Sequence, residues 1–193
     1  MTHPCYRFTY IQDGNPVLST TVAAMPSTTS YSAIDYLLDK ANIHDTVTKL
    51  MLYVDLLRWD DLEKEVFTDD IHVDYTSLFG GEAVNVKSKD QIGAWKSLFE
   101  RIEKSQHLLT SLIIDLPQPG SVPPPKKVQI YANYLVTLVL KDSEQKLVQN
   151  GGRYLLEVSR ITPSDGGNPW RISSAKADVV YFTSNKEFYD HAN

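Results

Sequence analysis

The sequence predicts an α+β protein in which helices cover one face of a curved antiparallel sheet. Apolar residues recur at helical spacing in the first part of the 193-residue chain, and strand-like segments separated by turns fill the second part. With 42% hydrophobic residues, a chain of this length can bury one good core. We therefore expect one domain over residues 33–193, preceded by an N-terminal extension over residues 1–32.

The composition argues against several classes of protein. The formal net charge of −5 is spread along the chain without a basic stripe, which argues against nucleic-acid binding. The single cysteine, Cys5, cannot form an internal disulfide and indicates a cytosolic setting. No stretch has the apolar length of an export signal or a membrane span. We expect a soluble, cytoplasmic protein that does not bind membranes.

The N-terminal part contains a predicted hairpin followed by helices. The turn-rich "QDGNP" separates "YRFTYI" from "VLSTTVAA", which predicts a hairpin at residues 6–24. Helical spacing predicts two helices, or one bent helix, over residues 33–59. The charged "DDLEKEVF" predicts a short helix, and the alternation in "IHVDYTS" predicts a strand that turns Tyr75 inward. A further helix is expected at about residues 90–103.

The remainder is predicted to be an antiparallel meander of four strands. The segment "SNKE" fits a capping box, with Ser184 as the cap and Glu187 at the third helical position, so a short terminal helix should follow. A pocket can remain between such a sheet and its helices, and inward-facing polar residues are therefore the candidates for a site. The four predicted strands are residues 106–116, 128–141, 151–161 and 170–182.

Four segments carry a resemblance to a known family: "YVDLLRWDDLEKEVFTDDIHVDYTSLFGG", "QIGAWKSLF", "SQHLLTSLII", and "GGRYLLEVSRI" with the later "PWRIS". They resemble the SnoaL-like group of the nuclear transport factor two-like superfamily, which includes scytalone dehydratase. The resemblance covers roughly residues 33–185. It implies a cone-shaped barrel in which a curved sheet wraps around the N-terminal helices.

The resemblance also implies a site. In scytalone dehydratase the pocket is lined by a Tyr–Asp pair at the end of the long helix, a strand tyrosine, two histidines flanking a water, and a nearby asparagine. The strand tyrosine matches Tyr75, and the histidine that follows glutamine matches His107. The other positions fall on residues without that chemistry: Leu57 and Arg58 for the helix pair, Leu138 for the second histidine and Leu155 for the asparagine.

The candidate side chains have alternative interpretations. With an ordinary pKa near neutrality, a histidine such as His107 can transfer protons if it faces a pocket. Local alternation alone is equally consistent with a partly exposed histidine at a strand end that has no function. Arg58 falls on the buried stripe of the helix and needs a carboxylate or a wet pocket, unless the helix frays before it. Tyr134 is the only polar residue on the apolar side of its strand, so its hydroxyl should bond inside, although it could be ordinary core.

Alternation and the family resemblance predict different positions for two strand residues. Alternation puts Glu157 and Arg153 in solvent, whereas the resemblance puts them in the pocket, where Glu157 could neutralise Arg58 or Arg153. Asp55 and Tyr53 flank the buried stripe and could reach the cavity rim.

The predicted catalytic residues are His107, Tyr75, Arg58, Tyr134 and Glu157. The predicted substrate-binding residues are Tyr53, Asp55, Leu57, Leu78, Trp95, Val136, Leu138, Arg153 and Leu155.

The predicted function is proton transfer without a cofactor. The sequence has no Gly-rich phosphate loop and no metal-ligand spacing, so we expect neither a cofactor nor a metal. We expect an isomerase, cyclase or dehydratase acting on a small hydrophobic oxygenated metabolite, such as a polyketide intermediate. The alternative is a non-catalytic module for small-molecule binding or dimerisation. The outward sheet residues Tyr131, Leu135 and Val139 predict a homodimer.

Overall fold

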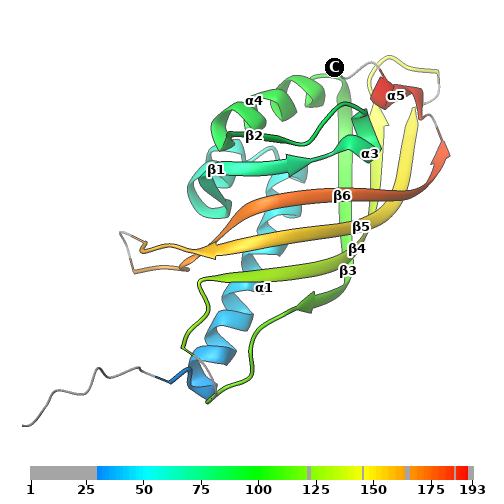
Figure 1. The fold of residues 1–193 in the computed structure, drawn as a ribbon. Coiled ribbons are helices and arrows are strands. Elements are labelled where there is room, and N and C mark those ends of the chain that lie inside the picture. The colour runs from blue at the N-terminus through cyan, green and yellow to red at the C-terminus, as the bar shows by residue number, and fades with distance from the viewer. Residues whose placement is uncertain (1–29, 121–122, 145, 164–165, 185, 191–193) are drawn as a thin grey trace, which may run out of the picture.

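The computed structural model describes residues 30–120, 123–144, 146–163, 166–184 and 186–190, so the hairpin predicted at residues 6–24 lies outside the described residues. One six-stranded sheet, in the order β2-β1-β6-β5-β4-β3, curves around helix α1 (Figure 1). Its strands are β1 (Phe67–Asp74), β2 (Val84–Lys87), β3 (Ile102–Ile114), β4 (Lys127–Leu140), β5 (Leu147–Arg160) and β6 (Trp170–Ser184). The helices are α1 (Ala33–Asp55), α2 (Trp59–Asp61), α3 (Thr76–Phe79), α4 (Ser88–Phe99) and α5 (Glu187–Asp190), with a π-helical turn η1 (Leu62–Val66).

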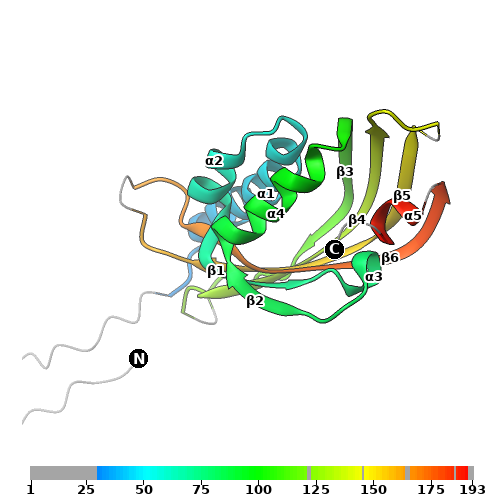
Figure 2. The ribbon, with the colours of Figure 1, turned by 90° about the horizontal axis from the view of Figure 1, so that it is seen from above.

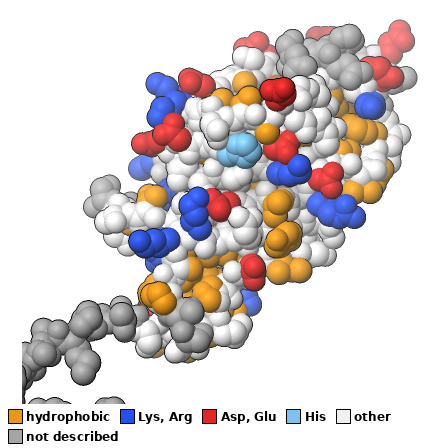
Figure 3. Space-filling model, viewed as in Figure 1, with side chains coloured by type: hydrophobic (Ala, Val, Ile, Leu, Met, Phe, Trp, Pro, Cys, Tyr) orange, Lys and Arg blue, Asp and Glu red, His pale blue; other side chains and the backbone are white. Residues whose placement is uncertain are grey.

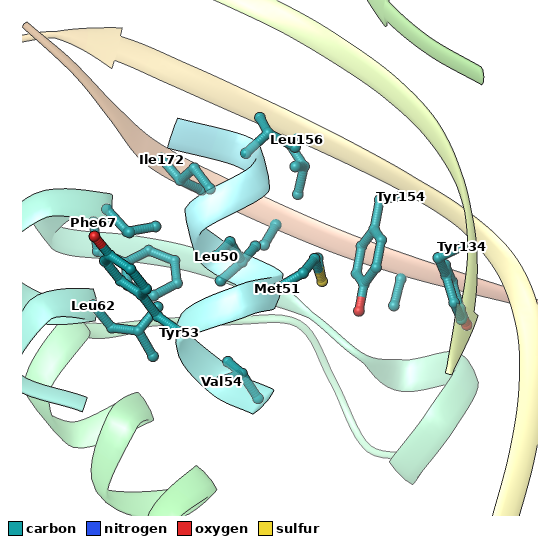
Figure 4. Close-up of a cluster of buried hydrophobic side chains, with 14 of the residues drawn as sticks. Leu50, Met51, Tyr53, Val54, Leu62, Phe67, Tyr134, Tyr154, Leu156 and Ile172 are labelled. Carbon is teal, nitrogen blue, oxygen red and sulfur yellow. The ribbon is translucent and has the colours of Figure 1, made fainter. Parts of the chain in front are cut away.

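Helix α1 supplies the helical side of the core. It begins at a capping box, in which the Ser32 hydroxyl accepts from the Asp35 backbone and the Asp35 carboxylate accepts from the Ser32 backbone. Figure 2 shows α1, α2 and α4 together on one side of the curved sheet. In Figure 4, Leu50 and Met51 of α1 lie among side chains of the sheet, including Leu156 and Tyr154. None of the helices in the described residues has the length and apolar content needed to cross a membrane.

Helix α1 ends at Asp55, earlier than the predicted limit of residue 59. The backbone N–H of Arg58 donates to Tyr53 O at 2.8 Å, and that of Leu57 donates to Val54 O at 3.1 Å. These two bonds form a Schellman motif, whose turning residue adopts the left-handed conformation. Leu57 occupies that position with a φ of 55°. The chain therefore turns away immediately after Asp55.

We expect Leu57→Gly to raise the free energy of unfolding by about 1 kcal/mol, because glycine adopts a positive φ without the steric cost that leucine bears. Little burial is lost, since Leu57 is 54% exposed. Leu56→Gly is the matched control: Leu56 is 57% exposed but has a φ of −90°, so glycine there should destabilise by roughly 0.5–1 kcal/mol. Urea denaturation measures both variants, and a less stable Leu57→Gly protein would contradict the assigned strain.

The long strands confirm the predicted meander, and two other features of the sheet differ from the prediction. Strands β3 to β6 pair antiparallel in sequence order. Strand β1 starts at Phe67, pairs parallel with β6, and ends before Tyr75. Strand β2 lies in a segment for which the sequence predicted no element, and it pairs antiparallel with β1. Both differences depend on pairing between separate segments of the chain, which local periodicity does not report.

The faces of the central strands follow simple alternation. All seven even-numbered residues of β4 from Val128 to Leu140 are buried, as predicted. The even-numbered residues of β5 from Val148 to Val158 are also buried, so its odd-numbered residues face outward. This parity decides which polar groups of β4 and β5 can reach a cavity on the concave side.

Candidate active site

A cavity lies between the concave face of the sheet and the helices. It encloses about 80 Å³, several times the roughly 10–15 Å³ that one water molecule needs on the same measure. Its wall is mainly aromatic and aliphatic, which suits a compact apolar molecule held by a few polar groups. The lining residues are Leu50, Met51, Val54, Tyr75, Leu78, Phe79, Trp95, Leu98, Phe99, His107, Tyr134, Val136, Leu138, Asn150, Tyr154 and Tyr189.

His107 is held at this cavity by a carboxylate. Its Nδ1 lies 2.6 Å from Asp55 Oδ1, and its backbone N–H donates to Asp55 Oδ2 at 2.7 Å. The Ser105 hydroxyl donates to Asp55 Oδ1 at 2.7 Å. The three bonds fix the orientation of both side chains, which are 12% and 14% exposed for His107 and Asp55 respectively.

The hydrogen bond between His107 Nδ1 and Asp55 determines which ring nitrogen of the imidazole carries the hydrogen. Burial of the Asp55 carboxylate opposes its ionisation, but the hydrogen bonds from His107 and Ser105 outweigh that effect, so the pKa of Asp55 lies below its ordinary value. An ionised carboxylate only accepts hydrogen bonds, and Nδ1 must therefore carry the hydrogen. In the neutral ring this leaves Nε2 as the acceptor available to a bound molecule.

The position of Asp55 is unfavourable for the helix itself. It is the last helical residue of α1, where the negative end of the helix dipole disfavours an acidic side chain by roughly 0.3–1 kcal/mol. No basic residue occupies that last turn. The carboxylate is instead satisfied by Ser105 and His107 of β3, so tertiary contacts outweigh the local preference. In the sequence, the acidic residue at the C-terminal end of a helix, where it is locally unfavourable, is the feature that could have indicated a tertiary partner for Asp55.

Tyrosines supply most of the other polar groups of the cavity. Tyr75 lies 6.2 Å from Trp95 between ring centroids, and Tyr134 lies 4.6 Å from Tyr154 (Figure 4 labels the latter pair). Burial raises the pKa of Tyr75, Tyr134 and Tyr154 well above the ordinary range. Burial also raises the pKa of Tyr189 to about 12. All four hydroxyls therefore keep their protons at neutral pH and can donate hydrogen bonds.

Tyr75 is positioned by the turn at the end of β1. The preceding residue, Asp74, accepts from the Thr76 hydroxyl at 2.7 Å and from Lys176 Nζ of β6 at 2.6 Å. These two bonds hold the pKa of Asp74 at about 2. The strand end that carries Tyr75 is thereby tied to β6.

We expect the stabilising effect of Asp74 to depend on pH. A carboxyl group with a depressed pKa in the folded state stabilises the fold fully above its unfolded value, 3.8, and loses that effect as pH falls through about 2. The difference in unfolding free energy between the natural protein and Asp74→Asn should therefore be constant above pH ~5 and shrink between pH ~4 and pH ~2. Urea denaturation across this range measures it, and a difference independent of pH would contradict the assignment.

The structure brings seven of the predicted site residues together around the cavity. His107, Tyr75 and Tyr134, all predicted as catalytic, line it, and so do four predicted substrate-binding residues, Leu78, Trp95, Val136 and Leu138. Their chemical roles remain predictions. The expectation that the Tyr134 hydroxyl bonds inside the protein is not met, because it has no hydrogen-bond partner among the described residues.

Arg58 lies outside the cavity, contrary to the prediction. Its Nε donates to Asp61 Oδ2 at 2.7 Å, its guanidinium lies 4.3 Å from the centre of the Tyr53 ring, and its side chain is 46% exposed. The prediction extended the helical stripe beyond residue 55, but the left-handed turn at Leu57 ends it. Leu57 itself is exposed. The acidic residue at the end of α1 is Asp55, three positions before Arg58.

The predictions for β5 that rested on the resemblance are also wrong. Glu157 pairs with Lys127 at 2.7 Å, and Arg153 lies 3.6 Å from Asp178, both away from the cavity lining. Leu155 shares their odd-numbered face and is exposed. Alternation had placed this face outward, because successive side chains of a strand point to opposite faces of the sheet.

Two helix residues predicted for the cavity rim have other contacts. Tyr53 is buried, but its hydroxyl donates to Glu65 at 3.2 Å and it is not among the lining residues. Asp55 contacts His107 and is likewise outside the lining. Asp55 therefore holds the imidazole, which differs from the substrate contact that was predicted for it.

Sequence reasoning missed three polar lining residues: Asn150, Tyr154 and Tyr189. Asn150 lies just before the strand predicted at residues 151–161, whereas β5 begins at Leu147 and continues through both glycines. Even parity on β5, extended back to residue 150, would have found Asn150 and Tyr154. Tyr189 comes from the terminal helix, whose docking no local pattern indicates. In the described ranges, no three His, Cys, Asp or Glu side chains gather as a metal site.

Comparison with known proteins identifies the fold and the family. No protein among the curated sequences matches the chain. The Kfla4162 protein from Kribbella flavida is 22% identical, with a TM-score of 0.69 over 80% of this chain and 99% of that one. The hexachlorocyclohexane dehydrochlorinase LinA-type3 from Novosphingobium barchaimii is 19% identical, with a TM-score of 0.61 over 79% and 93% of the two chains.

A scytalone dehydratase candidate from Novosphingobium aromaticivorans is 12% identical, with a TM-score of 0.63 over 78% of this chain and 89% of that one. At such identities these likenesses show the fold alone, and they confirm the predicted cone-shaped, nuclear transport factor two-like architecture. A family model described as the SnoaL-like domain matches residues 35–176. The chain therefore belongs to the SnoaL-like domain family.

Proposed function

We propose that the protein is a lyase or isomerase in which His107 removes a proton from a carbon atom of a small hydrophobic oxygenated molecule. One observation carries the proposal: the His107 Nδ1 lies 2.6 Å from Asp55 at a cavity lined mainly by apolar and aromatic side chains. A carboxylate that orients an imidazole, with the second ring nitrogen free for substrate, is the arrangement of a general base.

The proposed step balances without a further reactant. His107 Nε2 takes a proton from a carbon next to a carbonyl, and the C–H electron pair forms the C=C bond of an enolate. Asp55 balances the positive charge that the imidazole gains. Return of the proton to a different carbon of a conjugated enolate gives isomerisation. In a cyclisation, the enolate carbon instead forms a bond to a second carbonyl carbon of the same molecule, the C=O electron pair moves to its oxygen, and that oxygen takes the proton from His107. Transfer of the proton to a departing β-hydroxyl group instead releases water, and the enolate pair completes the new double bond.

Neutral donors would stabilise the oxygen that gains charge. Tyr75 and Tyr154 line the cavity and keep their hydroxyl protons at neutral pH. Donors fixed in an apolar surrounding act more strongly on developing charge than donors in water. Arg58, the cation predicted as a catalytic residue, lies outside the cavity, so in this proposal the tyrosines stabilise the negative charge in its place. We include among the substrates cyclic intermediates of the polyketide type, and the single cysteine supports a cytoplasmic location.

Hydrogen–deuterium exchange tests the proposal. 2-Indanone is a compact aromatic ketone with acidic C–H groups, and its exchange in D2O is followed by proton NMR. The protein should accelerate exchange beyond the buffer rate, and His107→Ala should abolish the acceleration. Binding of 2-indanone without acceleration would contradict the proposal and favour the alternative, a module that binds small molecules without changing them.

We further propose a homodimer formed through the outer sheet face, which faces the viewer in Figure 3. Ile113 and Leu155 are the register partners of Tyr131, and all three are exposed, Ile113 by 62%. Leu135 and Val139 on the same face are half-buried. Sedimentation should show a dimer that Tyr131→Glu converts to a monomer. A monomeric natural protein at micromolar concentration would contradict this interface.

A further inference from the structure

Two buried polar atoms at the cavity lack a hydrogen-bond partner within the described part of the chain. They are Tyr134 Oη and Asn150 Oδ1, and both residues line the cavity. Asn150 is 1% exposed. Buried polar atoms are nearly always paired, because an unpaired one loses its hydration without compensation. The two atoms therefore indicate where a bound molecule makes polar contacts.

The sheet brings these two residues together on its concave face. Asn150 is the register partner of Val136, and Tyr134 is the register partner of Gly152, so Tyr134 and Asn150 are diagonal neighbours. A side-chain Cβ at Gly152 would lie 2.9 Å from Tyr134 Oη. Because Gly152 has no side chain, the Tyr134 hydroxyl can lie over β5 at this position. Gly152 is two residues along the strand from Asn150.

The two atoms differ in hydrogen-bonding character. Burial raises the pKa of Tyr134, so its hydroxyl keeps the proton and can donate. Asn150 Nδ2 donates to Tyr189 Oη at 2.8 Å, which leaves Asn150 Oδ1 as an acceptor. A molecule that satisfies both must accept one hydrogen bond and donate another. A hydroxyl group does both, whereas a halogen substituent donates nothing and leaves Asn150 Oδ1 unpaired.

We propose that Tyr134 and Asn150 form a hydroxyl-binding subsite that selects a ring bearing an alcohol or phenol group over the same ring bearing a halogen. This inference rests on the proposed function and narrows its substrate class to hydroxylated compounds. A site built to bond a hydroxyl rejects analogues that lack one, because its buried groups are then left unpaired.

The subsite lies across the cavity from the base. His107, Val136 and Asn150 form one register row across β3, β4 and β5. Adjacent strands are about 4.8 Å apart, so the backbones of His107 and Asn150 are separated by roughly 10 Å. The two side chains and one compact ring span that distance. A substrate would therefore present its acidic C–H to His107 and its hydroxyl to Tyr134 and Asn150.

Binding of phenol and chlorobenzene tests the subsite without requiring turnover. NMR titration of the full chain gives a dissociation constant for each compound. An apolar cavity without hydrogen-bonding groups would prefer chlorobenzene, because phenol loses more hydration on entering it. We expect phenol to bind at least about tenfold more tightly. Chlorobenzene binding as tightly as phenol, or more tightly, would overturn the proposal.

Variants assign the preference to the two residues. Tyr134→Phe removes only an unpartnered hydroxyl, so its melting temperature should equal or exceed that of the natural protein, and the phenol preference should fall several-fold. Asn150→Leu should also reduce the preference. Tyr131→Phe is the matched control, because the same change on the outer face of β4 should leave the preference intact. An unchanged preference in Tyr134→Phe, or a clearly lower melting temperature, would overturn the assignment.

His107→Ala separates this inference from the proposed function. The phenol preference should survive in that variant, because Tyr134 lies one strand and Asn150 two strands away from His107, whose imidazole is held by Asp55. Should 2-indanone exchange fail while the preference holds, the proposed catalysis is wrong and the subsite stands. Loss of the preference in His107→Ala with the fold intact would overturn the subsite as an independent feature.

Discussion

Replacing His107 by alanine is expected to reduce the accelerated exchange of 2-indanone by about 10²–10⁴-fold, the usual contribution of a general base. The imidazole is the group that takes the proton, and the cavity holds no second histidine among its lining residues. His72→Ala is the matched control. His72 also lies on a strand, but it is exposed and contacts Asn85 at 3.0 Å. Exchange should be unchanged in that variant.

Asp55→Asn tests the carboxylate separately from the base. The amide retains the size of the carboxylate but lacks its charge, and its NH2 group can favour the wrong imidazole tautomer. Exchange should fall by about 10²-fold or more, while the affinity for 2-indanone changes little. Ser105→Ala removes one hydrogen bond to the same carboxylate and should have a much smaller effect. Equal losses in both variants would indicate a general disturbance of β3 instead of a loss of charge.

Asp39→Ala should lower the free energy of unfolding by about 3–5 kcal/mol, the usual effect of removing one partner from a buried ion pair. Asp39 is 3% exposed and accepts hydrogen bonds from Tyr31 Oη and Trp170 Nε1, each at 2.9 Å. It also pairs with the Arg160 guanidinium, which stacks on Trp170. The substitution leaves one charge and two further donors without their acceptor.

The matched control for this prediction lies on the same helix. The Asp45 side chain is 67% exposed, and its Oδ1 lies 3.7 Å from the Nδ1 of the neighbouring, exposed His44. Asp45→Ala should change stability by less than ~0.5 kcal/mol. Urea denaturation compares the two variants, and similar values for both would show that the Asp39 network contributes little. Because Asp39 joins the start of α1 to the ends of β5 and β6, its loss should also loosen this edge of the core.

Local pattern predicted the parts of the site that depend on strand parity. The even-numbered side of β4 placed Tyr134, Val136 and Leu138 toward the helices, and the structure has them at the cavity. The same rule on β5 placed Glu157 outward, and it was correct where the family resemblance was not. Side chains on a strand alternate between two faces, so a short segment contains enough information to assign them.

The sequence by itself determined the α+β class, the meander and the inward residues of its strands, because these follow from periodicities within single segments. Only the tertiary structure decided which polar groups meet. Asp55 reaches His107 because α1 stops at the left-handed Leu57 and lies against β3. Asn150 joins Tyr134 through the register of β4 and β5. Such contacts join residues far apart in the chain, and their geometry depends on helix ends and strand register, which local periodicity does not specify.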